Sequence, residues 1–262
     1  LFFPGGDIGK LAVCGTVNDL AMSGARPRWL SVGFILEEGL PMETLRKVVD
    51  SMAATAKAAG VSIVAGDTKV VERGKADGLY LTTAGIGTVA GEVELVPGGI
   101  RPGDAIIVSG DIGRHGMAIM AQREGLAFDA PLVSDCAPLH EAVQDLLAAR
   151  LPVRCLRDCT RGGLATVLVE LARQSGRCLH LEEEAVPVTE TVRAACELLG
   201  IDPLYVANEG CFVAVVANEK ASEAVDRLRD GGFPEATRIG EVAAEAEGAG
   251  RLFLRNAFGI RR

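Results

Sequence analysis

The segment Val96-Pro-Gly-Gly-Ile-Arg-Pro-Gly-Asp104 divides the chain into two parts, because it places three glycines and two prolines within nine residues. Such a segment cannot lie inside a regular helix or strand. The chain has 262 residues, which is enough for two domains of ordinary size. We therefore expect an N-terminal domain at residues 1–96 and a C-terminal domain at residues 97–262.

Hydrophobic periodicity predicts helices and strands in both parts, without strict alternation between them. The expected helices are 10–23, 43–59, 116–124, 138–149, 164–174, 188–199 and 219–229. The expected strands are 29–36, 61–65, 79–89, 105–109, 178–182, 211–217, 236–242 and 251–255. This mixture predicts two α+β domains rather than one doubly wound parallel sheet.

Composition narrows the range of functions. The net charge is −8 and the basic residues are scattered, which argues against a nucleic-acid-binding surface. No apolar run is long enough to cross a membrane. The seven cysteines are an odd number without a Cys-x-x-Cys motif, which favours a reduced compartment, and we expect a cytoplasmic protein.

A first candidate site follows the apolar segment 61–65, which reads as a short strand that stops at Gly66. Asp67, Thr68 and Lys69 come next, where we expect the backbone to leave the sheet. A carboxylate there can hold Mg²⁺, and an ammonium group can face a phosphate. The alternative is an ordinary solvated turn, in which Asp, Thr and Gly are common.

Asn18 and Asp19 form a second candidate cluster inside the first expected helix. They are poor residues for a helix interior, so they either face water or direct an amide and a carboxylate at a ligand. Together with Asp67 they make a plausible Mg²⁺–nucleotide site. An acidic protein that binds phosphates generally needs such a cation between the like charges. The P-loop motif is absent, so this is not a P-loop enzyme.

The segment Asp158-Cys-Thr-Arg-Gly-Gly-Leu164 opens another expected helix. Free backbone N–H groups at a glycine-rich helix start bind anions, and Arg161 supports that interpretation. The alternative is a plain helix cap formed by Thr160 or Asp158.

Glu209 is a candidate general base, because it lies between Asn208 and Gly210 just before an apolar strand. An ordinary turn residue is an equally good interpretation. For His115 we expect a structural role, and for the cysteines the role of small core residues.

Seven motifs carry a resemblance to a known family. They are Pro-Gly-Gly-Asp-Ile-Gly-Lys, Cys-Gly-Thr-Val-Asn-Asp-Leu-Ala, Ser-Gly-Ala-Arg-Pro, Phe-Ile-Leu-Glu-Glu-Gly, Ala-Gly-Asp-Thr-Lys-Val-Val, Ser-Gly-Asp-Ile-Gly-Arg-His-Gly and Asp-x-Thr-Arg-Gly-Gly-Leu-Ala. The chain resembles the HypE family of hydrogenase maturation proteins over its whole length. The wider superfamily of aminoimidazole ribonucleotide synthetase, selenophosphate synthetase and thiamine-monophosphate kinase shares only the Asn-Asp and Gly-Asp parts.

The resemblance implies a PurM-like α+β protein of two domains that dimerises through a barrel of N-terminal strands. It implies ATP and Mg²⁺ in a cleft near the dimer interface. The family accepts a carbamoyl group on a C-terminal cysteine from the carbamoyltransferase HypF and dehydrates it with ATP to a thiocyanate. The cyanide then passes to iron on the HypC–HypD complex, for NiFe hydrogenase.

The same resemblance implies roles for particular residues. Asp19 and Asp67 would bind Mg²⁺–ATP, and Asn18 and Thr68 would support the nucleotide or metal. Lys69 would stabilise charge at the reacting group, and Glu209 would be the base. The phosphates would be lined by Arg161, Gly162 and Gly163.

The chain differs from the family pattern at both ends. We expect a fragment without the family's N-terminal glycine-rich segment and without the C-terminal cysteine tail, and therefore inactive alone. Two alternatives to a carbamoyl dehydratase stay open from the sequence. One is another ATP-dependent synthetase of the superfamily, and the other is a non-catalytic dimeric scaffold that docks maturation partners.

Overall fold

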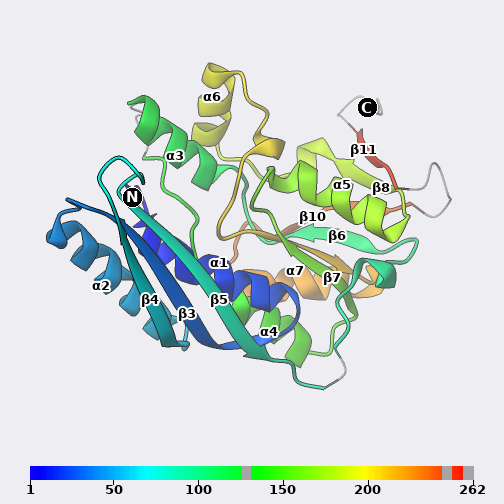
Figure 1. Ribbon diagram of the computed structural model, residues 1–262. Helices are drawn as coiled ribbons and strands as arrows, with labels where there is room; N and C mark the ends of the chain where they lie inside the picture. The colour runs from blue at the N-terminus through cyan, green and yellow to red at the C-terminus, as the bar shows by residue number, and fades with distance from the viewer. Residues whose placement is uncertain (92, 126–130, 244–249, 256–262) are drawn as a thin grey trace.

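The computed structural model describes residues 1–91, 93–125, 131–243 and 250–255. Two units, each built on its own sheet, lie side by side (Figure 1). The first contains the following elements, in chain order: β1 (Phe2–Phe3), β2 (Gly6–Asp7), α1 (Ile8–Met22), β3 (Arg26–Glu37), α2 (Met42–Ala58), β4 (Ser62–Val71) and β5 (Leu79–Thr88).

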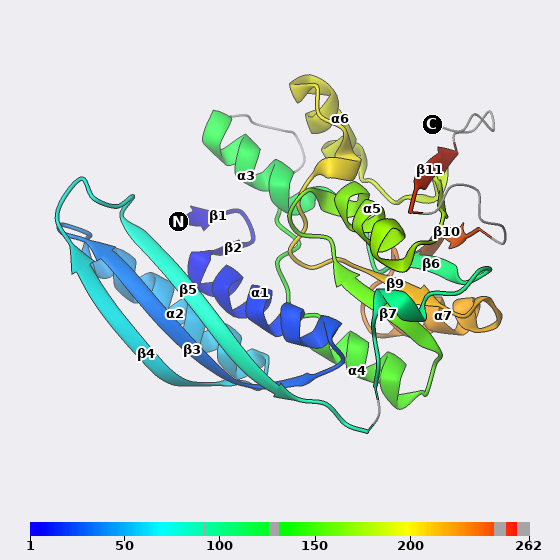
Figure 2. The ribbon, with the colours of Figure 1, turned by 45° about the vertical axis from the view of Figure 1, so that its right-hand side comes forward.

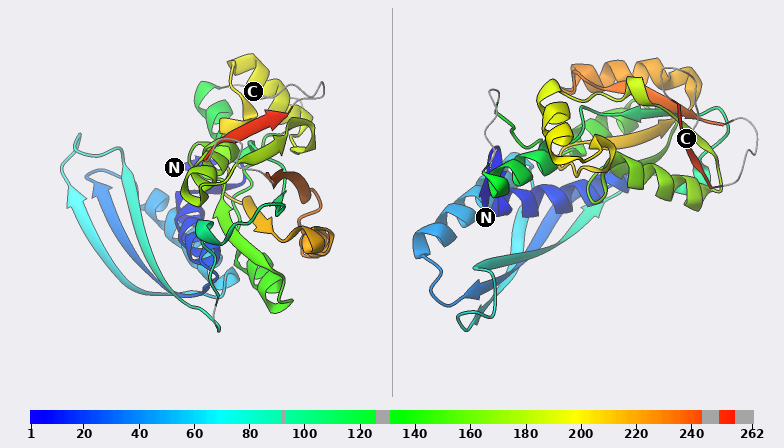
Figure 3. Two further views of the ribbon diagram at one scale, coloured as in Figure 1. Left: turned by 90° about the vertical axis from the view of Figure 1, so that its right-hand side faces the viewer. Right: turned by 90° about the horizontal axis from the view of Figure 1, so that it is seen from above.

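The first unit is a three-stranded sheet covered on one face only. The strand order is β4-β3-β5, with β3 parallel to β4 and antiparallel to β5. Helices α1 and α2 pack against one face around a core that includes Val13, Val17, Leu30 and Met52. No element of the described chain covers the other face, which we call the open face (Figure 3).

The second unit is a six-stranded sheet with helices on both faces (Figures 1 and 2). Its strand order is β11-β8-β10-β6-β9-β7. Its elements are β6 (Ala105–Val108), α3 (Arg114–Glu124), α4 (His140–Ala148), β7 (Val153–Asp158), α5 (Gly163–Ser175), β8 (Leu179–Glu182), α6 (Glu190–Leu199), β9 (Phe212–Val216), α7 (Ala221–Asp230), β10 (Thr237–Val242) and β11 (Leu252–Arg255). Helix α5 packs on one face of the sheet, and α4 and α7 pack on the other.

Helix α1 belongs to both units. Val13 and Val17 are part of the first core, whereas Ala21 and Met22 are fully or almost fully buried in the core that α4 and α7 form with the second sheet. The first helix of the chain therefore joins the two sheets. Any residue on the exposed side of α1 near this junction lies between the two units.

The helix and strand pattern expected from the sequence is confirmed, with ends shifted by a few residues. The hairpin β1–β2 and the strand β7 were not predicted. One strand boundary was wrong: β4 does not stop at Gly66 but runs on to Val71, because β3 pairs with it from Ser62 to Val71. Backbone pairing therefore outweighs the poor strand propensity of Asp67.

A short 3-10 turn, Pro97–Gly99, lies between the two sheets, within the segment rich in glycine and proline. The boundary between residues 96 and 97 stays a prediction. Among the described residues, none of the helices is long and apolar enough to cross a membrane.

Gly85 on β5 lies directly beneath α1, where there is no room for a larger side chain. A Cβ atom at this position would lie 2.7 Å from Thr16 Cγ2 and 2.8 Å from Leu20 Cδ1. We predict that Gly85→Val lowers the free energy of unfolding by about 1–3 kcal/mol, because the added methyl groups would push α1 away. Urea unfolding measures this difference. Gly98→Ala is the control, since its Cβ would meet no atom within 4 Å; equal losses in the two variants would contradict the packing argument.

Candidate functional site

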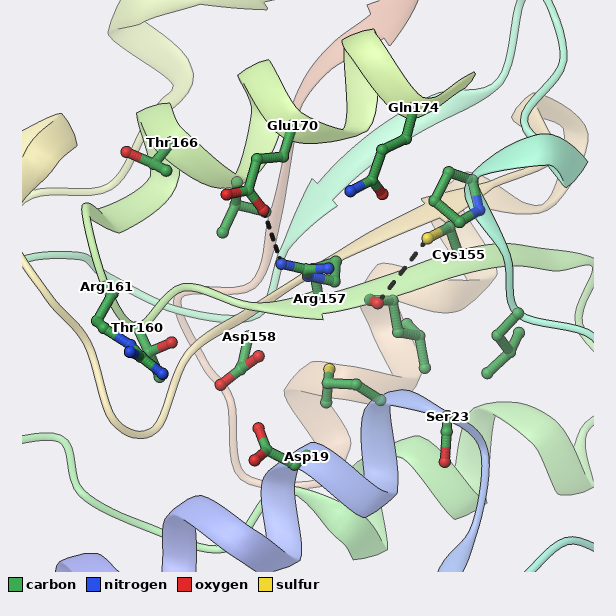
Figure 4. A pocket seen from close by; sticks show the side chains of 15 residues that line it. Asp19, Ser23, Cys155, Arg157, Asp158, Thr160, Arg161, Thr166, Glu170 and Gln174 are labelled. Carbon is green, nitrogen blue, oxygen red and sulfur yellow. Dashed lines mark hydrogen bonds and ion pairs between the residues drawn. The ribbon is translucent and has the colours of Figure 1, made fainter. Parts of the chain in front are cut away.

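Two adjoining cavities lie where α1, β7 and the start of α5 meet. The larger cavity, of 720 Å³, extends along β7 and α5 and is lined by Arg157, Glu170 and Gln174 among others (Figure 4). The smaller, of 300 Å³, extends along α1 towards Glu209. Both cavities are lined by Asp19, Asp158, Thr160 and Arg161.

Asp19 and Asp158 face one another across this junction from two different elements. Asp19 projects from α1, and Asp158 is the last residue of β7 (Figure 4). The pKa of Asp19 is raised, first by its partial burial and then by the negative charge of Asp158, while Arg161 opposes the shift. The two carboxylates therefore bring negative charge to the same pair of cavities, where a cation would be attracted.

Arg161 brings positive charge to both cavities, and the two glycines after it shape the turn. Gly162 and Gly163 have φ values of 74° and 63°, which favour glycine. A Cβ atom on Gly163 would lie 2.6 Å from the carbonyl oxygen of Leu204. Neither glycine is among the residues that line the two cavities, and their place beside the phosphates stays a prediction.

The plain helix cap considered from the sequence is not what the structure shows. The residue at the N-cap position of α5 is Gly162, and no side chain accepts a hydrogen bond there. Asp158 and Thr160 therefore keep their oxygen atoms for the cavities. From the sequence, Asp158 was considered only as a helix cap. Its position just before a glycine-rich turn could have indicated a site residue.

Glu209 lines the smaller cavity opposite α1. Its pKa is raised to about 7 by burial first, and then by the negative charges of Asp135, Asp158 and Asp19. A carboxylate whose pKa lies near neutral pH is suited to take up a proton in a reaction. The structure thus places the predicted base beside Asp19 and Arg161.

Asn18 has a different position from the one predicted. Its side chain is 1% exposed and lies on the buried side of α1. The amide nitrogen donates to the carbonyl oxygens of Ala137 (3.1 Å) and Glu209 (3.3 Å), and the amide oxygen accepts from the N–H of Leu139 (2.8 Å). The prediction of a nucleotide or metal ligand is therefore corrected, because backbone groups already occupy this amide.

Asp67 lies on the open face of the first sheet. It is in register with Gly33 of β3 and Thr82 of β5. The next residue of β5, Thr83, points to the opposite face, where its hydroxyl lies 2.6 Å from that of Thr16 on α1. Since side chains alternate along a strand, Asp67 faces away from α1.

Lys69 is two residues further along β4 and shares the open face with Asp67, whereas Thr68 between them faces the other side. All three residues are exposed, and none lines either cavity. Within one chain the structure therefore does not bring Asp67, Thr68 or Lys69 to Asp19. Asp19 and Asp67 of one chain lie on opposite sides of the first sheet, so one ion could join them only across a contact between two chains, and their shared ion stays a prediction.

The structure supports the structural role expected for His115. This histidine is buried, its Nδ1 lies 2.8 Å from Ser134 Oγ, and burial lowers its pKa to about 4. All seven cysteines are buried, as expected for small core residues.

Comparisons with known proteins identify the family. Residues 1–89 match the family described as AIR synthase related protein, N-terminal domain, and residues 101–252 match AIR synthase related protein, C-terminal domain. Carbamoyl dehydratase HypE of Azotobacter vinelandii is 55% identical over 248 residues, which cover 94% of this chain and 72% of that protein. The chain belongs to the carbamoyl dehydratase HypE family.

Solved structures of the HypE family have the same fold. A crystal structure of the hydrogenase maturation protein HypE in complex with ATP has a TM-score of 0.97 at 50% identity, covering 100% of this chain and 79% of that one. A crystal structure of a HypE–HypF complex has a TM-score of 0.95 at 47% identity, covering 100% and 85%. The family resemblance and the two-domain α+β fold predicted from the sequence are thereby confirmed, and the chain is a member of an enzyme family.

The raised pKa of Glu209 predicts a pH-dependent stability difference. In the folded protein Glu209 binds a proton up to about pH 7, against an ordinary value of 4.5, so its ionisation between these pH values destabilises the fold. We expect Glu209→Gln to be more stable than the wild type at pH 8, and the difference to shrink as the pH falls towards 5. Urea unfolding at both pH values measures it.

Glu197→Gln on the exposed surface of α6 is the matched control, for which we expect the same stability difference at both pH values. A Glu209→Gln difference that does not change with pH would contradict the raised pKa.

Proposed function

We propose that this protein uses ATP to dehydrate a carbamoyl group carried on a cysteine thiol. The observation that carries the proposal is the position of Glu209, a carboxylate with a raised pKa, in the same cavity as Asp19 and Asp158. Membership of the carbamoyl dehydratase HypE family supports the reaction class. A superfamily synthetase of another kind has no comparable support, and a non-catalytic scaffold would not need this cavity.

The reaction balances as a transfer of the carbamoyl oxygen to phosphate. The thiocarboxamide R–S–C(=O)–NH₂ reacts with ATP to give the thiocyanate R–S–C≡N, ADP and inorganic phosphate. Attack of the amide oxygen on the γ-phosphoryl group breaks the bond to the β-phosphate oxygen. The phosphorylated oxygen then leaves, and the nitrogen loses both of its protons to form the nitrile.

Glu209 supplies the base for this reaction. The amide nitrogen releases protons as the carbon–nitrogen triple bond forms, and a nearby carboxylate takes one of them up. With a pKa of about 7, roughly half of Glu209 is in the proton-accepting form at neutral pH, and that form is a stronger base than an exposed glutamate.

Arg161 and Thr160 are placed to bind the phosphates. Arg161 is exposed at the junction of the two cavities, where its guanidinium can contact phosphoryl oxygens and stabilise charge that develops on them. Thr160 adds a hydroxyl at the same junction. The larger cavity is big enough for a nucleotide, and a solved member of the family is an ATP complex.

Mg²⁺ fits the donor set of this site. Asp19 and Asp158 offer two carboxylates at the cavity junction, and Mg²⁺ in nucleotide sites commonly takes one or two carboxylates together with phosphates and water. When bound, Mg²⁺ neutralises charge between the carboxylates and the phosphates.

A homodimer is the second part of the proposal. The open face of the first sheet exposes the apolar side chains of Trp29 (46%), Ile35 (40%), Tyr80 (50%) and Ile86 (63%). A second copy packed against this face would bury them. Within one chain, Asp67 and Lys69 lie on the open face and reach neither cavity. We therefore propose that they act at a catalytic cleft only when two chains pack together.

The remaining partners follow from the family. HypF is the partner in a solved HypE complex, and we propose that it supplies the carbamoyl group here. We propose the HypC–HypD complex as the acceptor of the cyanide ligand for NiFe hydrogenase, in the cytoplasm.

The catalytic proposal is tested on the full-length protein with a carbamoylated cysteine. We predict that Glu209→Gln lowers the rate of water loss from the adduct about 10²- to 10⁴-fold, because the base is removed. We expect Asp158→Asn to raise the Mg²⁺ concentration needed for half-maximal rate. Mass spectrometry of the cysteine adduct measures both. Full dehydration by Glu209→Gln would contradict the assignment of the base.

The dimer is tested by placing a charge on the open face. We predict that Tyr80→Glu shifts the protein from dimer to monomer in light scattering after size exclusion and removes dehydration with it. The matched control is Leu198→Glu, which changes a side chain that is 66% exposed on α6 in the other unit. A Tyr80→Glu protein that stays dimeric would contradict the dimer face, and a fully active monomer would contradict the role given to Asp67 and Lys69.

A further inference from the structure

Buried polar side chains form hydrogen bonds with both the N–H and the C=O group of Glu209, whereas its carboxylate has no such partner among the described residues. Glu209 lies outside any helix or strand, between the 3-10 helix Pro203–Tyr205 and β9, and its carbonyl oxygen accepts from the N–H of Ala137 at 3.3 Å. Within the described part of the chain, the Glu209 carboxylate accepts no hydrogen bond. The position of the carboxylate in the cavity therefore depends on what holds the main chain of residues 208–210.

Asp135 holds the N–H side of this turn. Its two carboxylate oxygens accept from the N–H of Glu209 at 3.1 and 3.2 Å, and one of them also accepts from the N–H of Gly210 at 3.0 Å. The Asp135 side chain is 8% exposed. The contact is close enough that a Cβ atom on Gly210 would overlap the carbonyl oxygen of Asp135.

Asn18 holds the C=O side of the same residue. Its amide donates to the carbonyl oxygen of Glu209 at 3.3 Å, and it also binds both Ala137 and Leu139 in the segment that carries Asp135. Because Asn18 is on α1, this contact fixes Glu209 relative to Asp19, which projects from the same helix into the cavity.

Asn208 completes the arrangement one residue earlier. It is fully buried, accepts from the N–H of Gly113, and donates to the carbonyl oxygens of Cys159 and Val206. Cys159 directly follows Asp158, so this contact connects the turn that carries Glu209 to the end of β7, where Asp158 lies.

From this geometry we infer that Asp135 and Asn18 are positioning residues for the dehydration reaction, which hold the Glu209 backbone so that its carboxylate meets the substrate amide. The inference rests on the proposed function. Neither residue lines either of the two cavities described above. A displacement of about 1 Å at a catalytic group can cost about a hundredfold in rate. Loss of these contacts should therefore reduce kcat and leave ATP binding largely unchanged.

Two near-isosteric substitutions test the inference in the full-length protein. Asp135→Asn replaces one acceptor oxygen by a donor, and Asn18→Asp removes the donors to Glu209 and Ala137 while keeping the acceptor for Leu139. We expect each variant to lower kcat for dehydration about ten- to a hundredfold, with KM for ATP within about twofold of the wild type.

Asp104→Asn is the matched control. Asp104 is also a buried carboxylate, 4% exposed, which accepts from the N–H of Arg101 at 2.7 Å and pairs with Arg154, but it lines neither cavity. We expect this variant to unfold at lower urea concentration and to keep its kcat.

A double-mutant cycle with Glu209→Gln separates positioning from a general loss of structure. If Asp135 and Asn18 act through Glu209, adding either substitution to Glu209→Gln causes no further loss of rate. Wild-type kcat in both single variants, or losses that multiply in the Glu209→Gln background, would overturn the inference while leaving the proposed function intact. A fully active Glu209→Gln protein would overturn the proposed function, and the inference with it.

Discussion

The docking of α1 between the two sheets is the interaction on which the rest of the structure depends. One part of the helix is buried in the first core, through Val13 and Val17, and its last turn is buried in the second core, through Ala21 and Met22. Between these apolar contacts, Asn18 connects α1 to the backbone of the second unit by three hydrogen bonds. A buried amide without those partners would cost about 1–3 kcal/mol, so the helix has one favourable position.

This docking collects negative charge at one place. Asp19 comes from the first unit, and Asp158, at the end of β7, and Glu209, in the turn before β9, come from the second, so the charges meet only when the units are assembled. Their mutual repulsion and partial burial raise the pKa of Asp19 and of Glu209. This repulsion between carboxylates lowers the free energy of unfolding, and a bound cation would reduce the repulsion. The same arrangement gives a proton acceptor matched to neutral pH.

Much of the fold could be predicted from the sequence because its signals are local. The glycine- and proline-rich segment at 96–104, the amphipathic helices and the apolar strands each follow from short-range chemistry. The end of β4 was wrong because it depends on pairing with β3, which is a long-range effect. The hairpin at the start of the chain was missed because its strands are only two residues long.

The site residues could be predicted only in part, because residue chemistry is local whereas the direction of a side chain depends on the fold. Asp19, Arg161 and Glu209 were found by their chemistry and by family motifs, and the structure brings them together. The direction of a side chain on a helix or strand was harder to obtain. Asn18 lies on the buried side of α1, one residue before exposed Asp19, and Asp67 lies on the face of the sheet opposite α1.

Asp135 carries no motif of its own. Its importance comes only from the backbone groups that the fold places around it, Glu209 N–H and Gly210 N–H. Sequence patterns cannot show such a contact, because the two segments are far apart in the chain.

Hydrogen exchange at single amides of the native protein tests most directly the claim that α1 fixes the turn at residues 208–210, which carries Glu209. The account predicts that the N–H groups of Glu209 and Gly210 exchange as slowly as those in the middle of α1, and that both become faster when Asn18 is changed to Asp. Fast exchange of the Glu209 and Gly210 amides in the wild type, while α1 stays protected, would show that the turn moves independently of the helix and would contradict the account.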